Sequence, residues 1–377
     1  MFKKFLCTIA AAVFFAACPL RVYAAEVNAK AAVLIEAESG RVLAEKNANE
    51  RLPMASTTKI MTALLTLEQD NLDEYFVVDE GAICVEGSSM GLTAGDSVTL
   101  RVLAAGMLLA SGNDAANAAA VRVAGSVPAF VKLMNDRAAE LGMVNTTFVT
   151  PSGLSAEGHH STAYDMALLA REALQNKNFA KICRQKSMTL CFGNPPFKRV
   201  LFNHNSLLKS YKGASGVKTG FTKEAGRCLV SSAWRDGVRL ICVTLACPDD
   251  WHEHTRLLDY GFATLKATSL SEFMPPLSLS VGGGVKPTVK LVPQRAAVAA
   301  LAEGDKTRIE TRVLLGRAVA APVQKGQVLG EVIFTLDKNE LLRVPLYASE
   351  AVAARELIKT PNYFGFSIKR LFTGKDG

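Results

Sequence analysis

Three short groups of polar residues in this chain have the types and spacing that acyl transfer needs. The first is Ser56-Thr57-Thr58-Lys59, at the start of an apolar run. On a helix, residues three apart lie on one face about a turn apart, so the lysine amine can reach the serine hydroxyl. Burial lowers the pKa of a lysine, and a neutral amine can take the proton that a serine nucleophile must lose. The group predicts Ser56 as a nucleophile and Lys59 as its base.

The same spacing occurs twice more, at Ser206 to Lys209 and at Ser215 to Lys218. Neither copy opens a long apolar helix. For the first group, the alternative is a serine that only caps a helix, followed by an exposed lysine. A serine at a helix N-terminus also lies beside backbone N–H groups that can hold an oxyanion, which favours the catalytic interpretation.

The second group is Ser111-Gly112-Asn113, after a run of helical composition, and the third is Lys218-Thr219-Gly220, before a strand-like run. A hydroxyl and a carboxamide two residues apart in a loop can relay a proton and bind a substrate amide. An ammonium beside a hydroxyl can hold a carboxylate, and a glycine there lets a ligand approach the backbone. The alternatives are a turn that ends a helix for the second group and a turn between strands for the third.

The order Ser-x-x-Lys, Ser-x-Asn, Lys-Thr-Gly is the signature of penicillin-binding proteins and class A β-lactamases. On these motifs the chain resembles the low-molecular-mass penicillin-binding proteins, which are serine-type D-Ala-D-Ala carboxypeptidases. The resemblance covers residues 27–265 and includes further stretches. These are 53–64, Asn145-Thr146-Thr147-Phe148, Pro151-Ser152-Gly153-Leu154, His159, Asp165-Met166-Ala167, 214–222 and Gly226.

The resemblance implies a catalytic role for four residues. Ser56 would be acylated, with Lys59 as its base. Ser111 and Lys218 would form a hydroxyl–amine pair that moves a proton to the leaving D-alanine. The substrate of the family is the peptidoglycan stem peptide that ends in D-Ala-D-Ala, and β-lactam antibiotics are its covalent inhibitors.

The resemblance also implies the substrate-binding residues. Asn113 would bind the peptide amide, and Lys218 with Thr219 would hold the terminal carboxylate next to Gly220. The backbone N–H groups of Ser56 and Phe221 would form the oxyanion hole. Many members of the family have histidine where Phe221 stands, so only the backbone contribution is expected at this position.

Two histidines are candidates for a supporting role. His204 stands where some family members carry an arginine that helps to hold the carboxylate, and a histidine is mostly neutral at pH 7. His159 is a candidate support for the catalytic groups, or else a surface histidine of the turn Glu157-Gly158-His159-His160.

Two other functions are alternatives to the carboxypeptidase. A β-lactamase of the same superfamily would need a deacylating glutamate, and Glu157 is the only acid near the right region; the long C-terminal extension also argues against it. A non-catalytic wall-binding protein is disfavoured because all six side chains of the three groups are present.

The apolar patterns predict an α+β protein with the penicillin-binding/β-lactamase-like transpeptidase fold and a small C-terminal all-β domain. The expected strands are 31–35, 41–45, 186–190, 199–202, 226–234 and 238–246, and in the last domain 286–291, 308–314 and 328–336. The expected helices are 60–68, 100–109, 114–123, 127–141, 164–174 and 252–262. The predicted segments are a signal peptide at 1–24, a catalytic domain at 25–272, a β-rich domain at 273–350 and an amphipathic tail at 351–377.

The N-terminus predicts export. Lys3 and Lys4 precede an apolar run over 5–20, and Val22-Tyr23-Ala24 has the small-residue pattern of a signal-peptidase site. We expect cleavage after Ala24 and a location at the outer face of the cytoplasmic membrane, in the periplasm or in the cell wall. A lipoprotein cut before Cys18 is the alternative.

Composition excludes other classes of protein. The chain of 377 residues is 49% hydrophobic and 21% charged, which excludes a wholly disordered chain. Its net charge of +8 falls to +5 once residues 1–24 are removed. This mild excess suits an anionic wall or membrane surface and is too diffuse for a nucleic-acid partner. No Cys/His set has zinc spacing, so neither a metal nor a cofactor is expected.

Six cysteines remain after the signal peptide, and their even number permits disulfides in an exported chain. Cys183 and Cys191 flank a short segment and are the candidate pair, but apolar strand-like surroundings favour buried free thiols for several of the six. They are Cys84, Cys183, Cys191, Cys228, Cys242 and Cys247.

The tail combines positive charge with aromatic residues. From Arg355 to Gly377 five basic residues stand against two acidic ones, a net charge of +3. A helix over 364–373 would gather its apolar residues into one stripe. The segment 351–377 is therefore a candidate for peripheral contact with an anionic membrane; docking on the chain's own β-domain is the alternative.

Overall fold

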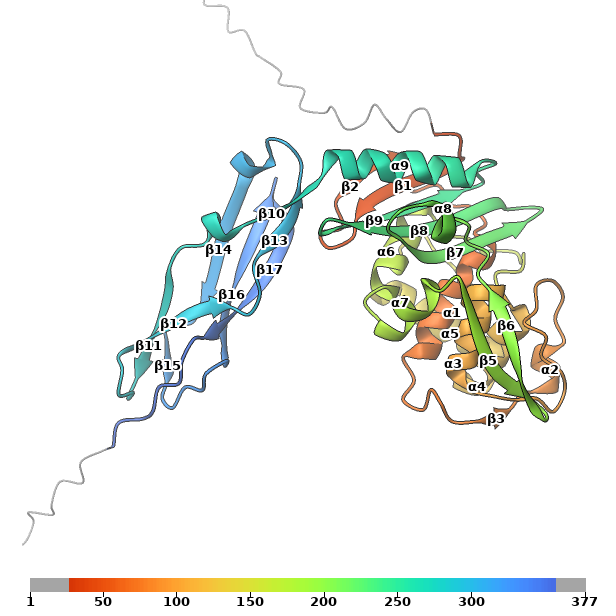
Figure 1. The fold of residues 1–377 in the computed structure, drawn as a ribbon, viewed down its shortest axis with the longest axis horizontal. Coiled ribbons are helices and arrows are strands. Elements are labelled where there is room, and N and C mark those ends of the chain that lie inside the picture. Colours follow the sequence, from red (N-terminus) through yellow and green to blue (C-terminus); the bar gives the residue numbers. More distant parts are fainter. Residues whose placement is uncertain (1–26, 357–377) are drawn as a thin grey trace, which may run out of the picture. The chain divides into compact units, whose positions relative to one another are not determined.

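The structure is a computed structural model that describes residues 27–356 (Figure 1). The expected signal peptide, its cleavage site, Cys18 and most of the candidate tail lie outside the described residues. The described chain forms two units. The first runs to Thr268 and also includes Ala299–Thr307, and the second comprises Ser269–Val298 and the chain from Arg308 onward.

The first unit is built on a five-stranded antiparallel sheet in the order β2-β1-β9-β8-β7. Strands from the two ends of the unit pair at its centre, because Ala31 lies opposite Leu245 and Glu36 opposite Leu240. One sheet therefore combines strands from both ends of the first unit. The strands are β1 (Ala31–Glu36), β2 (Val42–Lys46), β7 (Ala214–Thr222), β8 (Gly226–Arg235) and β9 (Val238–Leu245).

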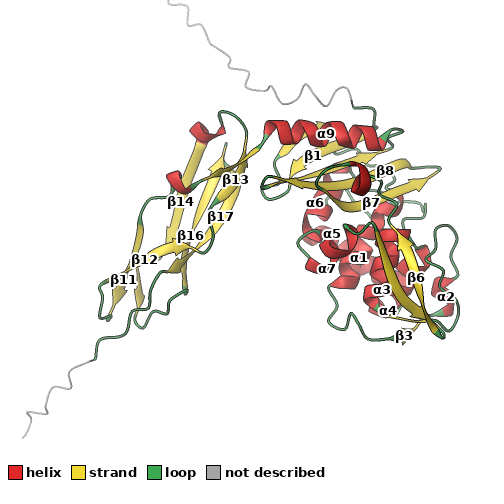
Figure 2. Cartoon of the chain, viewed as in Figure 1, coloured by secondary structure: helices red, strands yellow, loops and turns green. Residues whose placement is uncertain are grey.

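Helices cover both faces of this sheet (Figure 2). The six residues of β1 are all buried, since successive side chains point to opposite faces and each face has its own apolar cluster. Val33 and Ile35 join the larger cluster, while Ala32 and Leu34 join the one that contains Leu257 of α9 (Asp250–Thr264). The central strand is therefore a continuous apolar run.

The larger cluster is surrounded by helices that hold the first two polar groups. Helix α1 is buried along its whole length. The expected helix over 100–109 is interrupted: α3 ends at Ala105 and a π-helical turn, Gly106–Ala110, follows it. The helices are α1 (Lys59–Leu67), α2 (Glu80–Ile83), α3 (Leu100–Ala105), α4 (Asn113–Ala124), α5 (Val127–Glu140), α6 (Ala163–Ala173), α7 (Lys177–Cys183) and α8 (Leu207–Ser210).

A second, four-stranded sheet in the order β3-β4-β5-β6 stands apart from the main one. Its long strands correspond to the expected strands at 186–190 and 199–202, which pair with each other and not with the main sheet. Composition alone predicts that a segment is extended but not which sheet it joins. The strands are β3 (Phe76–Val77), β4 (Ser97–Val98), β5 (Ser187–Gly193) and β6 (Pro196–Phe202).

The second unit contains a six-stranded sheet in the order β14-β16-β17-β12-β11-β15. β11, β15 and β17 were not among the expected strands. Beyond β17, Val352 and Ala354 form isolated bridges with Val323 and Gly284, so the first residues after 350 belong to this unit. The strands are β11 (Leu277–Gly282), β12 (Thr288–Pro293), β14 (Ile309–Leu315), β15 (Ala318–Ala320), β16 (Val328–Leu336) and β17 (Asn339–Ala348).

The segment 299–307 returns to the first unit. Asp305, which is buried, accepts a hydrogen bond of 2.5 Å from Arg41, the residue just before β2. The two short strands β10 (Lys266–Ser269) and β13 (Val298–Leu301) pair in a sheet of their own. The first division between the units thus falls at 268/269, and the later segment 299–307 belongs again to the first unit. The sequence pattern predicts one boundary here, at 272/273.

The described residues contain neither a disulfide nor a cluster of metal ligands. All six cysteines of residues 27–356 are free thiols, with Cys84 and Cys191 exposed and the other four buried. No three His, Cys, Asp or Glu side chains of this range are grouped to hold a metal ion. Within the same range, no helix combines the length and apolar character needed to span a bilayer.

Candidate active site

Ser56 lies in a 3-10 turn, Ala55–Thr58, that leads directly into α1. Ala55 has a left-handed backbone, with φ of +47°, which is a strained conformation for a residue with a side chain. Two neighbours hold it there. Thr58 donates a hydrogen bond of 2.8 Å to the Ala55 carbonyl, and Gly153 packs so closely that a Cβ on it would lie 2.0 Å from the same oxygen.

Lys59 is fully buried and its ammonium has three acceptors in reach. Nζ lies 2.9 Å from Ser56 Oγ, 2.7 Å from Asn113 Oδ1 and 2.6 Å from the Ser152 carbonyl oxygen. Burial, and next the positive charge of Lys218, hold the pKa of Lys59 well below its usual range. The first and second polar groups therefore meet at one amine, and burial makes its proton easier to lose than that of a lysine in water.

The π-helical turn and α4 present the second group. Ser111 ends the turn with a left-handed φ of +60°, and Asn113 is the first residue of α4. Asn113 Nδ2 donates one hydrogen bond of 2.7 Å to the Glu86 carbonyl, which leaves its second hydrogen for a ligand. The next residue, Asp114, accepts from the backbone N–H groups of Met90 and Leu92, both at 3.0 Å, and thereby fixes the loop beside the site.

β7 carries the third group along the edge of the main sheet. Lys218 Nζ donates to Ser111 Oγ at 3.0 Å and to the Thr219 carbonyl at 2.8 Å. Burial lowers the pKa of Lys218 to about 7. Gly220 is required by the close approach of β7 to the nucleophile, since a Cβ there would lie 3.1 Å from the Ser56 backbone nitrogen and 3.0 Å from the Met54 carbonyl.

The buried amine of Lys218 makes the stability of the fold depend on pH. Its pKa is about 7 when folded and about 10.4 when unfolded, so between these values the unfolded chain binds more protons. The free energy of unfolding of the parent protein should therefore rise with pH relative to that of Lys218→Met, by up to about 1.4 kcal/mol per pH unit. Urea unfolding of both proteins at about pH 6, 8 and 9.5 measures the difference. A difference that stays constant over this range would contradict the lowered pKa.

The three groups meet in one pocket with a volume of about 290 Å³. The exposed side chain of Phe221 forms part of its wall. Hydrogen bonds join Lys59 to Ser56 and Asn113, and Lys218 to Ser111. Ser56 and Ser111 bring the two sets together, because both line this pocket. The residues that line the pocket are Ser56, Ser88, Ser111, His204, Thr219, Gly220, Phe221, Arg227, Asp250 and Trp251.

The sequence matches the D-alanyl-D-alanine carboxypeptidase family over residues 19–249 and the C-terminal domain of penicillin-binding protein 5 over residues 274–354. The chain belongs to the D-alanyl-D-alanine carboxypeptidase family. It is therefore an enzyme, a hydrolase of the serine-type D-Ala-D-Ala carboxypeptidase class. The resemblance noted in the sequence is confirmed, and nothing in these matches favours the β-lactamase or the non-catalytic alternative.

Relatives of known name extend over most of the chain. The carboxypeptidase DacF of Bacillus subtilis is 36% identical over 90% of this chain and 88% of its own length. The carboxypeptidase DacC of Escherichia coli is 36% identical over 88% and 86%. Penicillin-binding protein 5 from Haemophilus influenzae, a solved structure, has a TM-score of 0.65 at 30% identity and covers 87% of this chain and 98% of its own. The predicted fold, with its C-terminal all-β domain, is confirmed.

In this carboxypeptidase His159 supports the turn that carries the nucleophile. Its Nδ1 accepts a hydrogen bond of 2.9 Å from the Val149 N–H, so the proton of the neutral ring lies on Nε2. Nε2 is 2.9 Å from Thr58 Oγ1, the hydroxyl that bonds the Ala55 carbonyl. Burial lowers the pKa of His159 to about 4. The ring is neutral at pH 7 and is buried, not a surface histidine of a turn.

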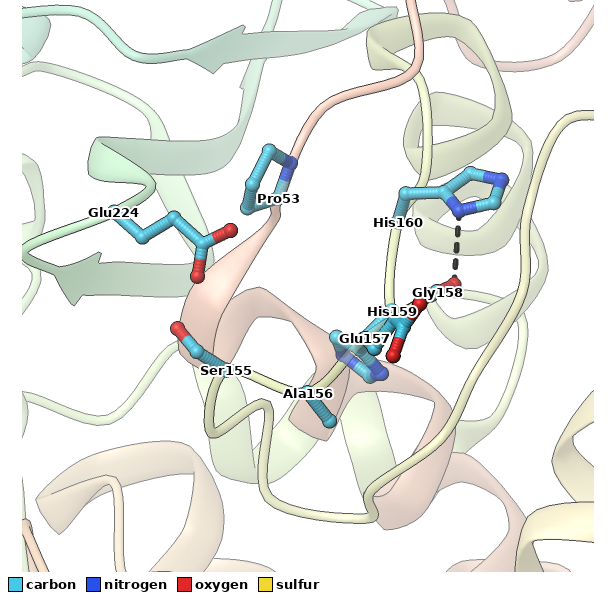
Figure 3. A pocket seen from close by; sticks show the side chains of 8 residues that line it. All are labelled: Pro53, Ser155, Ala156, Glu157, Gly158, His159, His160 and Glu224. Atoms are coloured by element: carbon cyan, nitrogen blue, oxygen red, sulfur yellow. Dashed lines mark hydrogen bonds between the residues drawn. The ribbon is translucent and has the colours of Figure 1, made fainter.

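A second and larger cavity, of about 490 Å³, lies beyond His159 and contains none of the candidate catalytic residues. Glu224, from the turn after β7, points across it toward Ser155 (Figure 3). His160 Nδ1 donates to the Gly158 carbonyl at 2.9 Å, which holds its ring at the rim. The lining residues are Pro53, Ser155, Ala156, Glu157, Gly158, His159, His160 and Glu224.

His204 lies at the wall of the active-site pocket. Desolvation, and next the positive charge of Lys218, lower its pKa below the usual value. The side chain is therefore neutral at pH 7, as its residue type suggested. It offers a ring nitrogen to the pocket but no permanent charge.

Several residues of this site were not found from the sequence. The Ser152 carbonyl is a backbone group, so no residue type identifies it. Asp114 follows the Ser-x-Asn group directly, but its residue type alone does not indicate that it fixes the neighbouring loop. Arg227 follows the third group closely and Asp250 lies further along the chain; neither belongs to a motif, and the register of β7 and β8 and the start of α9 bring them to the pocket.

The two further copies of the Ser-x-x-Lys spacing do not form a site. Ser206 and Lys209 are exposed on the four-residue helix α8. Ser215 and Lys218 lie on β7, but the buried Ser215 Oγ has no hydrogen-bond partner in the described residues and Lys218 Nζ bonds Ser111 instead. Only the copy on the turn that leads into α1 places an amine against a serine hydroxyl.

Proposed function

We propose that this carboxypeptidase removes the terminal D-alanine from peptidoglycan stem peptides ending in D-Ala-D-Ala, through an acyl-enzyme on Ser56. The observation that carries the proposal is the 2.9 Å contact between buried Lys59 Nζ and Ser56 Oγ. The other two neighbours of this amine, Asn113 Oδ1 and the Ser152 carbonyl, can only accept hydrogen bonds. A neutral Lys59 gives its two hydrogens to them, and its lone pair is left for the Ser56 hydroxyl.

Acylation follows from this arrangement. Lys59 takes the proton of Ser56 as Oγ attacks the carbonyl carbon of the penultimate D-alanine. The oxyanion that forms is held by the backbone N–H groups of Ser56 and Phe221, the first of which lies in the opening turn of a helix, where N–H groups lack intrahelical partners. Asn113 Nδ2 holds the substrate amide through its remaining hydrogen.

The leaving group needs a proton. The C–N bond breaks as the amine of the terminal D-alanine receives a proton from Ser111 Oγ, which is replenished by Lys218 at 3.0 Å. A pKa of about 7 lets Lys218 exist in both protonation states near neutral pH. Water then attacks the ester, which releases the shortened peptide and restores Ser56.

β-Lactams are proposed to acylate the same serine. Opening of the lactam ring leaves the departing nitrogen attached to the acyl group, so the adduct persists and can be weighed. Incubation with benzylpenicillin should add the mass of one antibiotic molecule, and peptide mapping should assign it to Ser56. D-alanine release from a D-Ala-D-Ala peptide should stop in the same sample. Release without any adduct, or an adduct on another residue, would contradict the proposal.

We assign catalysis to the segment 25–272 and an accessory role to the β-rich segment 273–350. All candidate catalytic and binding side chains precede residue 272. The signal-like N-terminus supports export, with action at the outer face of the cytoplasmic membrane, in the periplasm or in the cell wall. No metal, cofactor or nucleic acid enters the proposed reaction.

We also propose that the C-terminal tail attaches the enzyme to anionic membranes. Residues 355–377 combine a net charge of +3 with four aromatic side chains, and each basic residue near an anionic surface contributes about 1 kcal/mol. The protein lacking residues 1–24 should co-sediment with anionic vesicles at low salt, and a version ending at Glu356 should not. This end point keeps the bridges of Val352 and Ala354. Equal sedimentation of the two forms would refute the anchor.

A further inference from the structure

The wall of the active-site pocket carries an arginine, Arg227 on β8. It lies directly across the hairpin from Phe221. Side chains of directly paired residues share a face of the sheet, and residues two apart on one strand do as well. Thr219, Phe221 and Arg227 therefore face the same side of the sheet, and all three line the pocket.

The guanidinium is fixed at one end. Nε and Nη2 of Arg227 both donate to Asp250 Oδ1, at 3.1 and 2.7 Å. The Asp250 side chain is 3% exposed, whereas that of Arg227 is 41% exposed. The Trp251 ring centre lies 5.6 Å from the guanidinium carbon. Nη1 makes no hydrogen bond to any residue within 27–356, so this end of the fork is available to a ligand.

The other basic groups of the pocket do not supply a permanent positive charge. Lys218 is committed to Ser111 and to the Thr219 carbonyl, and its pKa is about 7. His204 is neutral at pH 7 because its pKa is lowered. An arginine stays charged at any pH at which the enzyme is folded, and its planar fork matches a carboxylate. Among the residues that line the pocket, only Arg227 has these properties.

We propose that Arg227, positioned by Asp250, binds the C-terminal carboxylate of the substrate and the corresponding carboxylate of a β-lactam. This inference rests on the proposed function and assigns to Arg227 the permanent charge for which His204 was the sequence-based candidate. Thr219 would supply a second hydrogen bond from the same face. Arg227 then makes the enzyme select free C-terminal acids over blocked ones.

The test compares benzylpenicillin with its methyl ester, which differs only in the charge of the carboxylate. In Arg227→Gln the acylation rate constant for the free acid should fall about 10- to 100-fold, the scale of one hydrogen bond to a charged group. The rate constant for the ester should change less than about threefold, so the preference for the acid is lost. Arg227→Lys, which keeps a charge without the fork, should recover part of the preference.

Arg235→Gln is the matched control, since Arg235 is on the same strand and pairs with Asp259 at 3.2 Å but does not line the pocket. It should leave the acid-to-ester ratio unchanged. Asp250→Asn should lower the ratio less than Arg227→Gln, because it frees the guanidinium without removing it.

Three results would overturn the inference. If Arg227→Gln lowered the acylation rate constants for the acid and the ester equally, Arg227 would have only a structural role. No loss for either would mean that the carboxylate is held elsewhere. An unchanged ratio in Asp250→Asn would refute the positioning role of Asp250. Failure of the parent protein to form any adduct at Ser56 would instead refute the proposed function, so the two failures are distinguishable.

Discussion

Replacing Ser56 with alanine will abolish both D-alanine release and penicillin labelling. Ser56 Oγ is the only hydroxyl that Lys59 Nζ contacts in residues 27–356, so no other group can form the acyl-enzyme with this base. The loss of a nucleophile of this kind is on the order of 10⁶ in rate. Intact mass after incubation with benzylpenicillin and a D-alanine release assay measure the two losses.

The chain supplies its own control for this experiment. Ser206→Ala removes the serine of an exposed copy of the Ser-x-x-Lys spacing and should leave both activities unchanged. The thermal unfolding temperature of Ser56→Ala should stay close to that of the parent protein, because the change removes only one hydroxyl from a partly exposed side chain. Labelling retained in Ser56→Ala, or mapped to Ser206 or Ser215, would refute the assignment.

Replacing Lys59 will reduce acylation by about three decades, the scale of a lost general base. Lys59→Arg keeps a positive charge that cannot be given up at neutral pH, so Ser56 keeps its proton. Lys59→Met keeps the approximate volume without the amine, and it separates loss of the base from crowding by the larger arginine. Stopped-flow acylation with a fluorescent penicillin gives the rate constants.

Lys209→Met is the control for Lys59, since Lys209 is exposed on α8. Its acylation rate should match that of the parent protein. A rate within tenfold of the parent protein in both Lys59 variants would show that another group takes the proton of Ser56. Near-ultraviolet circular dichroism of each variant checks that the fold is intact.

The positions of the motifs on secondary structure could be predicted wherever spacing and periodicity agree. Ser56 and Lys59 have helical spacing and precede a long apolar run, and they lie one turn apart as expected. Ser215 and Lys218 have the same spacing, but they lie on the strand β7. On a strand, unlike a helix, residues three apart are not brought side by side. The Ser-x-x-Lys spacing therefore predicts a serine–lysine contact only where the flanking residues form a helix.

Other parts of the site depend on backbone geometry that residue types do not specify. Ser111 is aimed by a π-helical turn that interrupts a run with ordinary helical composition. The Ser152 carbonyl reaches Lys59 through the path of a loop. Arg227 meets Phe221 only because the hairpin between β7 and β8 has its particular length, and a one-residue change of register would turn the arginine to the other face.

The β-rich domain also contains features that could not be predicted from the sequence. β17 contains Pro345 and alternates irregularly, so the sequence did not predict it, yet it pairs with both β16 and β12. The return of 299–307 to the first unit includes a long-range ion pair, between Arg41 and Asp305, and the pairing of β13 with β10. Contacts across more than 250 residues leave no local signal in composition.

The position of β7 at the edge of the main sheet bears on which part of a peptide substrate the enzyme recognises. Its only strand neighbour in the described chain is β8, so its outer backbone groups can pair with an extended peptide as an added strand. Such pairing recognises main-chain amides and is indifferent to most side chains. Selectivity must then come from the end of the peptide, and stem peptides of different internal composition can share one catalytic edge. An unpaired edge also invites association between copies of a protein; here Thr219, Gly220 and Phe221 of the edge strand line the active-site pocket.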